Sequence, residues 1–198
     1  MNVPMVALLA SGSGSNAAAM LDFWSNGAVK AAGIWTNRRT AGVWNRALDV
    51  PIFHLVPGQD DEAVLAQWRE AGVSALVLAG YLKPVPPLWI QAFGDRCYNI
   101  HPALLPAYGG HGMYGHHIHE AVVAADEAES GLTIHRVTER YDEGPILFQM
   151  RTPLRPGDTA ESLGARILQG EHWAYPRVVT ADLLGHPMPT QLPEGWSK

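Results

Sequence analysis

The amino-acid sequence predicts an α/β fold built on an open, mostly parallel sheet flanked by helices, with an antiparallel strand near the C-terminal part. Three observations support this prediction. Short, continuously apolar runs recur through the first half of the chain, as expected of parallel strands buried on both faces. Helical patterns separate these runs, so strands and helices alternate. In the second half, two strand-like runs follow each other with a turn between them.

The first half of the chain contains the predicted parallel strands. They share short length and buried-type side chains, and they cover residues 5–10 (MVALLA), 31–36 (AAGIWT), 75–80 (ALVLAG) and 97–100 (CYNI). The helices predicted between them cover about 16–26, 41–48, 60–71 and 86–93. The carboxyl ends of such strands form the edge of the sheet where open α/β proteins bind ligands. We therefore look for functional residues directly after these strands.

The pattern changes after residue 100. A long loop rich in Gly, Pro and His leads to a helix near 117–127, and strands are predicted at 130–137 and 145–152, joined by a turn. A long last helix is expected to begin near Asp158, because Asp158 and Glu161 have the spacing of a capping box with Asp158 as N-cap. The segment from Gly185 onward is rich in Pro and Gly and is predicted to be irregular.

Composition excludes several classes of function. The 198 residues are 47% hydrophobic, which suits one domain with a sizeable core. The net charge of −5 and the lack of a basic run argue against a nucleic-acid partner. The start of the chain reads as a strand and not as a signal peptide, and no apolar stretch approaches the roughly 18–20 residues of a membrane span. The single cysteine, Cys97, excludes a disulfide framework and favours a reducing, cytoplasmic compartment.

A phosphate-binding loop is predicted after the first strand, in the sequence ASGSGSN. Small residues let the backbone turn tightly and direct its N–H groups at an anion, and the following helix N-terminus adds its positive dipole. The residues of this cradle are Gly12, Ser13, Gly14, Ser15 and Asn16. The same glycines match the Rossmann dinucleotide fingerprint loosely, and Arg38 or Arg39 after the second strand would suit a 2′-phosphate, so NADP binding is an alternative.

Candidate catalytic residues follow the strand at 97–100. Asn99 and His101 share one face of an extended chain, and an amide beside an imidazole suits stabilisation of an oxyanion. Asp142 lies in the turn between the two later strands, where it is either a turn residue or a carboxylate that orients a histidine. Glu171 falls on the apolar stripe of the last helix and needs partners there, which are Arg166, Arg177 or the hydroxyls of a sugar.

The loop and helix after residue 101 hold four further histidines: His111, His116, His117 and His119. They lack the His-x-x-x-His pair of a zinc-binding helix, and neither the spacing of His117 and His119 nor that of His116 and His117 places two rings on one helix face, so no metal site is expected. The glycines of this loop favour a mobile lid that leads into the start of a helix.

Taken together, these motifs resemble the folate-dependent formyltransferases. The resemblance extends from about Val6 to about Val179 and keeps the order of the family's motifs: SGSGSN, LAGYLKPVPP, NIHPALLP, SGLTIHRVTERYDEGPILFQ, PGDT and EHWAYP. It implies the formyltransferase fold and transfer of a formyl group from 10-formyltetrahydrofolate to glycinamide ribonucleotide, both small-molecule substrates, in purine synthesis. The folate is then a co-substrate, and no tightly bound cofactor, metal, nucleic acid or membrane is implied. The length of the chain favours this member of the family over longer ones.

The resemblance also implies roles for individual residues. The catalytic trio of the family is matched by Asn99, His101 and Asp142. The loop that holds the substrate phosphate is matched by Gly14, Ser15 and Asn16. The acid that holds the ribose hydroxyls is matched by Glu171. The matching folate-binding residues are Leu78, Tyr81, Leu82, Lys83, Val85, Cys97, Val137, Thr138 and Tyr141. Lys83 stands where better-known members carry an arginine. The bond between Leu105 and Pro106 is predicted to be cis.

These roles predict that residues 1–198 form a single formyltransferase domain. Residues 1–98 form its phosphate-binding α/β half, 99–184 its catalytic and folate-binding half, and 185–198 an irregular tail. Two alternative functions are compatible with some of the same sequence features. One is a formyltransferase for another amine, such as a nucleotide-linked amino sugar, and the other is an NADP-dependent reductase. The oligomeric state does not follow from the sequence.

Overall fold

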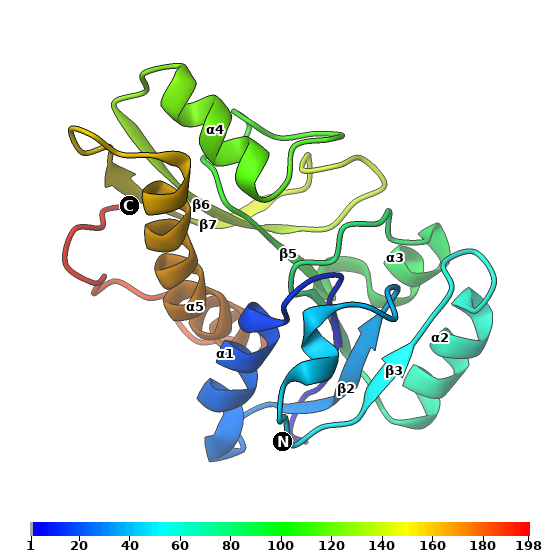
Figure 1. Ribbon diagram of the computed structural model, residues 1–198. Helices are drawn as coiled ribbons and strands as arrows, with labels where there is room; N and C mark the ends of the chain where they lie inside the picture. Colours follow the sequence, from blue (N-terminus) through cyan, green and yellow to red (C-terminus); the bar gives the residue numbers. More distant parts are fainter. Residues whose placement is uncertain (1) are drawn as a thin grey trace. The chain divides into compact units, whose positions relative to one another are not determined.

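The computed structural model describes residues 2–198 and consists of two compact units, one ending at Asn99 and one beginning at Ile100 (Figure 1). Parallel strands alternate with helices in the first unit, and an antiparallel pair of strands lies in the second. The predicted α/β fold, with a mostly parallel sheet and antiparallel strands in its C-terminal part, is confirmed.

The first unit contains a parallel sheet with the strand order β3-β2-β1-β4-β5. Its strands are β1 (Met5–Leu9), β2 (Lys30–Thr36), β3 (Ile52–His54), β4 (Ala75–Leu78) and β5 (Cys97–His101), whose last two residues belong to the second unit. In the middle of the sheet, Leu8 pairs with Ile34 on one side and with Val77 on the other. All three side chains are fully buried, which explains why these strands read as continuous apolar runs.

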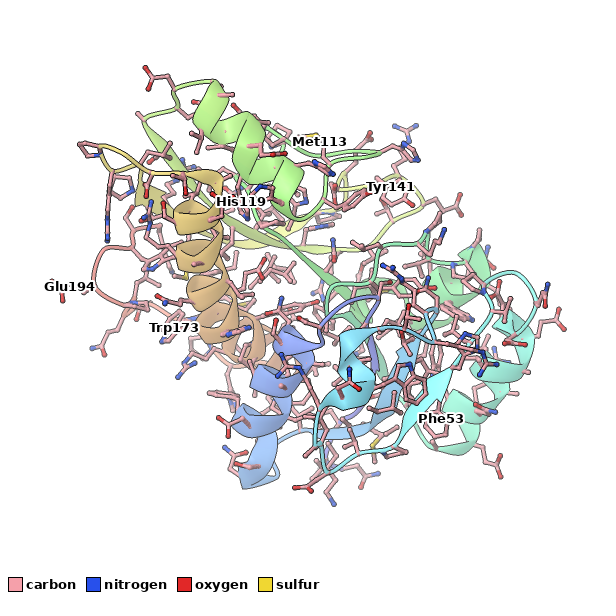
Figure 2. The ribbon with its side chains drawn as sticks, in the orientation of Figure 1. Phe53, Met113, His119, Tyr141, Trp173 and Glu194 are labelled. Carbon is pink, nitrogen blue, oxygen red and sulfur yellow. The ribbon has the colours of Figure 1, made fainter. Side chains whose placement is uncertain are left out.

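Helices α1 (Ser15–Phe23), α2 (Asp61–Glu70) and α3 (Pro87–Phe93) connect these strands, as predicted. Short 3₁₀ helices follow α1 at Trp24–Asn26 and α3 at Gly94–Arg96. An aromatic cluster joins the sheet to α2 and α3: Trp35 of β2 stacks on Phe53, labelled in Figure 2, and meets the edge of Trp68, which in turn contacts Trp89. Trp68 and Trp89 are fully buried, so this cluster holds both helices on the sheet.

Two elements of the first unit differ from the prediction. The helix expected over 41–48 is wrong: only a 3₁₀ helix, η2 (Gly42–Asn45), forms there. Tertiary contact decides this, because the Val43 N–H donates to the carbonyl of Gly12 at 3.1 Å and a Cβ on Gly42 would lie 3.2 Å from the Ser13 Cα. Strand β3 was not predicted, since its three residues are too few to show a period.

The second unit contains α4 (His116–Ala124), the antiparallel strands β6 (Glu129–Arg136) and β7 (Ile146–Pro153), and the long helix α5 (Ala160–Leu184) (Figure 1). Helix α5 packs on α4 and on both strands. Its buried stripe includes Leu163, Ile167, Ala174 and Val178, the positions predicted from the sequence. The peptide bond between Leu105 and Pro106 is cis, as predicted. Within residues 2–198, no helix has the length and apolar character needed to cross a membrane.

The predicted N-cap of α5 is wrong by one residue. Thr159 is the N-cap and forms a capping box with Ser162. The Asp158 carboxylate instead accepts two hydrogen bonds from the Arg166 guanidinium, at 3.1 and 2.5 Å, and further bonds from the Arg155 N–H and the Ser162 hydroxyl, each at 2.8 Å. The hydrogen bonds from Arg166 hold the pKa of Asp158 well below its ordinary value.

Replacing Asp158 with asparagine is expected to lower the free energy of unfolding by about 2 kcal/mol at pH 7, because an amide accepts these charge-assisted bonds poorly. The folded-state pKa is depressed, so the carboxylate stabilises the fold above its unfolded pKa of about 3.9, and this contribution is lost as the pH falls below that value. Urea unfolding of the wild type and of Asp158→Asn at pH 7 and at pH 3 measures both effects. The exposed Asp95→Asn is the control, and an equal loss in the two variants would contradict the prediction.

Candidate active site

The predicted phosphate loop lies between β1 and α1. Gly14 is the N-cap of α1 in the left-handed conformation, with φ +70° and ψ 20°, and no described side chain caps this helix end. The first-turn N–H groups of such a helix suit an anion. A Cβ on Gly14 would lie 2.6 Å from the Val43 Cγ2, because η2 packs against the loop. The loop therefore requires glycine at this position both for its backbone conformation and for the close approach of η2.

Replacing Gly14 with alanine is expected to lower the free energy of unfolding by roughly 2–4 kcal/mol, because the left-handed backbone costs about 1 kcal/mol and the clash with Val43 about 1–3 kcal/mol more. Gly27 follows the same α1–η1 segment with φ +80° and has open space around it, so Gly27→Ala is expected to cost only the backbone part. Urea unfolding of the two variants tests this difference. Equal midpoints would show that η2 yields to the methyl group.

Hydrogen bonds tie the phosphate loop to the predicted folate-binding segment within the first unit. The Ser11 hydroxyl donates to the Asn37 Oδ1 at 2.6 Å and accepts the Leu82 N–H at 2.9 Å, while the Ser11 N–H donates to the Gly80 carbonyl. Residues that follow β1, β2 and β4 are therefore joined at the carboxyl edge of this sheet, the edge where ligands bind in open α/β folds.

The folate-binding residues predicted in the first unit differ in exposure. Leu82 and Lys83 are exposed, whereas the others, Leu78, Tyr81, Val85 and Cys97, are buried. The Cys97 side chain is 0% exposed, and burial raises its pKa to about 12, so it packs as a neutral thiol. In the second unit, Val137, Thr138 and Tyr141 lie in the loop between β6 and β7, where the Thr138 hydroxyl donates to the Arg140 carbonyl. Figure 2 labels Tyr141, whose side chain is exposed.

The second unit brings His101 and Asp142 together. His101 ends β5 and is 3% exposed, and its Nδ1 lies 3.5 Å from the Asp142 Oδ2. Its Nε2 lies 2.8 Å from the Tyr108 carbonyl oxygen, to which it donates, and Asp142 also accepts the Gly110 N–H at 2.9 Å. Asn99 lies two residues before His101 on the same strand and is half-buried.

A second histidine, His135, faces the same carboxylate and was missed from the sequence. Its Nε2 lies 3.5 Å from the Asp142 Oδ1, and its Nδ1 donates to the Arg136 carbonyl at 2.7 Å. His135 is 2% exposed on β6 and directly follows the fully buried Ile134 in the sequence pattern SGLTIHRV. A histidine inside such a buried strand was the available signal, because a buried imidazole needs polar partners.

The electrostatics of this group favour an ionised Asp142. Burial by itself raises the pKa of Asp142, but the hydrogen bond from His135, the charge of His101 and the Gly110 N–H together bring the pKa below its ordinary value. For His101, burial lowers the pKa, and the charge of Asp142 and the Tyr108 carbonyl oppose this effect only in part. Asp142 is thus the group that supports a positive charge on the His101 ring.

The loops around His101 hold unusual backbone conformations. Asp142 and Tyr108 adopt φ values of +58° and +56°, in the left-handed region that non-glycine residues rarely occupy. Both conformations serve the contacts just described, because Tyr108 presents its carbonyl to His101 and Asp142 presents its carboxylate to both histidines. Strain of this kind concentrates at functional sites.

Glu171 lines a cavity of about 300 Å³ within the second unit, together with His116, His119 and Glu161. The Glu171 side chain is 6% exposed. Of the two arginines predicted as its partners, Arg166 pairs with Asp158, and Arg177 donates to the Trp173 carbonyl. The carboxylate is therefore placed in the wall of a cavity whose remaining lining includes the apolar side chains of Ile167 and Leu168.

The four further histidines do not form one cluster. His111 lies in the loop before α4, with its ring 5.9 Å from that of Tyr141, and the other three lie in the first turn of α4. His116 and His117 are exposed and lie near Glu120, whereas His119 is buried. Among the described histidines, cysteines and acidic residues, no group of three is arranged to hold a metal ion. The start of the predicted lid is held in place, because Tyr108 and Gly110 bond to His101 and Asp142.

The chain is similar to known proteins over most of its length. A family model described as "Formyl transferase" matches residues 5–179. The chain is 34% identical to a phosphoribosylglycinamide formyltransferase of Bacillus subtilis, over 90% of this chain and 94% of that protein. It is 38% identical to a chloroplastic phosphoribosylglycinamide formyltransferase of Vigna unguiculata, over 89% of this chain but only 60% of the relative's length. The crystal structure of a glycinamide ribonucleotide transformylase 1 from Symbiobacterium toebii has a TM-score of 0.83 at 33% identity, covering 92% of this chain and 89% of that one.

Proposed function

We propose, because this chain belongs to the formyl transferase family, that it transfers the formyl group of 10-formyltetrahydrofolate to the amine of glycinamide ribonucleotide in purine synthesis. The observation that supports this proposal most strongly is the pairing of His101 with Asp142 at 3.5 Å at the end of β5, two residues after Asn99. An amide and a charged imidazole are the donors that stabilise the oxyanion of an acyl transfer.

The proposed reaction needs one bond to form and one to break. The substrate amine attacks the formyl carbon, and a tetrahedral oxyanion develops on the formyl oxygen. The Asn99 amide and the His101 imidazolium donate to this oxygen, while Asp142 stabilises the imidazolium. The bond from the formyl carbon to the folate nitrogen then breaks, and the proton lost by the amine passes to that nitrogen, with His101 as the acid. The His101 Nε2–H that the Tyr108 carbonyl accepts here is the donor we assign to the oxyanion.

The substrates are assigned to residues as follows. Gly14, Ser15 and Asn16 bind the phosphate through the N-terminus of α1, and Glu171 accepts hydrogen bonds from the ribose hydroxyls. The folate is assigned to the predicted folate-binding residues named above, of which Leu82, Lys83 and Tyr141 have exposed side chains. Cys97 contributes to that pocket only through its backbone, because its side chain is fully buried. The folate acts as a co-substrate, and the proposed chemistry uses no metal.

Domain organisation and location belong to the same proposal. We treat residues 1–198 as one formyltransferase domain whose two halves are divided in the sequence near residues 98–100, where the two compact units also divide. A cytoplasmic location fits the single free cysteine, although two plant relatives are named chloroplastic.

A formyl-transfer assay tests the proposed function. Purified protein is mixed with 10-formyltetrahydrofolate and glycinamide ribonucleotide, and the absorbance of the deformylated folate is followed. Turnover that requires both substrates is the expected result. Binding of the folate without turnover on this amine would contradict the acceptor and favour another amine, such as a nucleotide-linked amino sugar.

A further inference from the structure

The cavity between α4 and α5 contains a buried imidazole that the proposed mechanism does not use. We propose that His119 is a specificity-determining residue of this cavity, which hydrogen-bonds one hydroxyl of a bound sugar while Glu171 binds another. This inference rests on the proposed function, because it takes the ribose of the amine substrate as the sugar. It adds a residue from α4 to a subsite that the sequence assigned to Glu171 of α5 alone.

The position of the His119 ring supports this role. Figure 2 labels His119 on α4, where that helix faces α5. The residue is 7% exposed, and neither ring nitrogen forms a hydrogen bond with a described residue, although Nδ1 is fully covered by protein. Its Nε2 points toward Gly164 of α5, where a Cβ would lie 3.3 Å from Nε2 and 2.9 Å from Cδ2. Because Gly164 also lines the cavity, its missing side chain gives a ligand access to Nε2.

The His119 imidazole is buried without a hydrogen-bond partner among the described residues, and Nε2 is the ring nitrogen that a ligand in the cavity can reach. A buried donor or acceptor without a partner costs about 1–3 kcal/mol, so such groups in folded proteins are normally satisfied. Glu171 lines the same cavity and is also more than nine-tenths buried. Two buried polar side chains, one from each helix, therefore line a cavity whose walls also include the apolar side chains of Ile167 and Leu168.

The chemistry of the lining selects a neutral, hydroxylated ligand. Burial, together with the smaller effects of the charges of His116 and His101, lowers the pKa of His119 to about 4, so the ring is neutral at physiological pH. A neutral imidazole offers one donor and one acceptor, which suits a hydroxyl group. A phosphate or carboxylate is disfavoured, because the cavity presents the carboxylates of Glu171 and Glu161. A sugar ring, with hydroxyl groups and an apolar face, fits this combination.

Calorimetric binding of modified ribonucleotides tests the inference. The ligands are glycinamide ribonucleotide, its 2′-deoxy and 3′-deoxy forms, and ribose 5-phosphate, which lacks the amine. We expect His119→Leu to weaken binding of glycinamide ribonucleotide roughly tenfold, the value of one hydrogen bond. The variant should also stop distinguishing one deoxy form from the parent, whereas the wild type loses about tenfold with each. His117→Leu is the matched control, because His117 lies on the same helix turn with a side chain that is 65% exposed.

Several results would overturn the inference. A folded His119→Leu variant that distinguishes both deoxy forms as the wild type does would remove His119 from the subsite. An equal loss of affinity for all four ligands would show that His119 only supports the packing of α4. Should His119→Leu fail to fold, as judged by circular dichroism, Gly164→Ala keeps the ring and fills the access to Nε2, and it must reproduce the loss of hydroxyl discrimination.

The outcomes also separate this inference from the proposed function. If ribose 5-phosphate binds the wild type but binds His119→Leu more weakly, and the protein shows no formyl transfer, the proposed reaction is rejected and the sugar subsite stays in place. If the wild type transfers the formyl group but its binding of these ligands does not depend on His119, the proposed reaction stands and the role of His119 in the sugar subsite is rejected. If the wild type binds neither ribose 5-phosphate nor the ribonucleotides, both proposals fail.

Discussion

Replacing Asp142 with asparagine is expected to reduce kcat for formyl transfer by at least roughly 10²–10³-fold while the protein remains folded. The substitution keeps the size of the side chain and tolerates the left-handed backbone at φ +58°. It removes the negative charge that lies 3.5 Å from both His101 and His135. The imidazolium that we assign to the oxyanion then loses its electrostatic support. Steady-state kinetics at saturating folate and amine measure the loss, and circular dichroism checks the fold.

The pH dependence of this loss gives a second readout. The charge of Asp142 raises the pKa of His101, so its removal lowers that pKa further below the ordinary value of 6.5. At neutral pH the variant then has a smaller imidazolium fraction than the wild type. The deficit should narrow once the pH falls below the wild-type pKa of His101, because the wild-type ring is then nearly fully protonated while the ring of the variant still gains protons. A deficit that stays constant below the pH at which the wild-type rate shows the titration of His101 would show that Asp142 acts on something other than the charge of His101.

Asp126→Asn is the matched control for this variant. Asp126 is exposed after α4 and also adopts a left-handed backbone, with φ +51°, so the same substitution is made in the same conformation away from the two histidines. We expect it to keep the wild-type rate. Near-normal turnover by Asp142→Asn, or an equal loss in the two variants, would remove Asp142 from the catalytic trio.

Replacing His101 with glutamine is expected to cost a similar factor, at least roughly 10²–10³ in kcat, because the oxyanion loses a charged donor. Glutamine can still donate to the Tyr108 carbonyl, so the loop that follows β5 keeps one of its anchors. His186→Gln, at an exposed position after α5, is the control and should leave the rate unchanged.

The double variant of His101 and Asp142 shows whether the two residues act as a unit. If Asp142 acts by stabilising the His101 imidazolium, the Asp142→Asn substitution should cause no further loss of rate once His101 is glutamine. The double variant should then be no slower than the slower single variant, as is usual for catalytic residues that act together. Multiplication of the two single losses would instead indicate that Asp142 has an independent role, for instance through His135.

The sequence by itself determined the fold class and most elements of this protein. Strands buried on both faces read as apolar runs, because every position in β1 from Val6 to Leu9 is fully buried. Helices α2 and α3 followed from periodicity and from breaks between the runs, and the capping signal placed the start of α5 to within one residue. Each of these features depends on the spacing of residues that are close together in the sequence, so it can be recognised without the tertiary structure.

Only the tertiary structure decided the features that depend on distant partners. Within the segment 41–48, only a 3₁₀ helix forms, at Gly42–Asn45, because it packs against Gly12 and Gly14. Asp158 binds Arg166 eight residues later instead of capping its helix. His135 looked like a strand residue until the chain brought it to Asp142. Likewise, the unpartnered ring of His119 and its cavity arise only where α4 meets Gly164 of α5. Contacts between residues far apart in the sequence produce no periodic pattern of side chains along the chain. Such contacts, and the chemistry they allow, are therefore visible only in the folded structure.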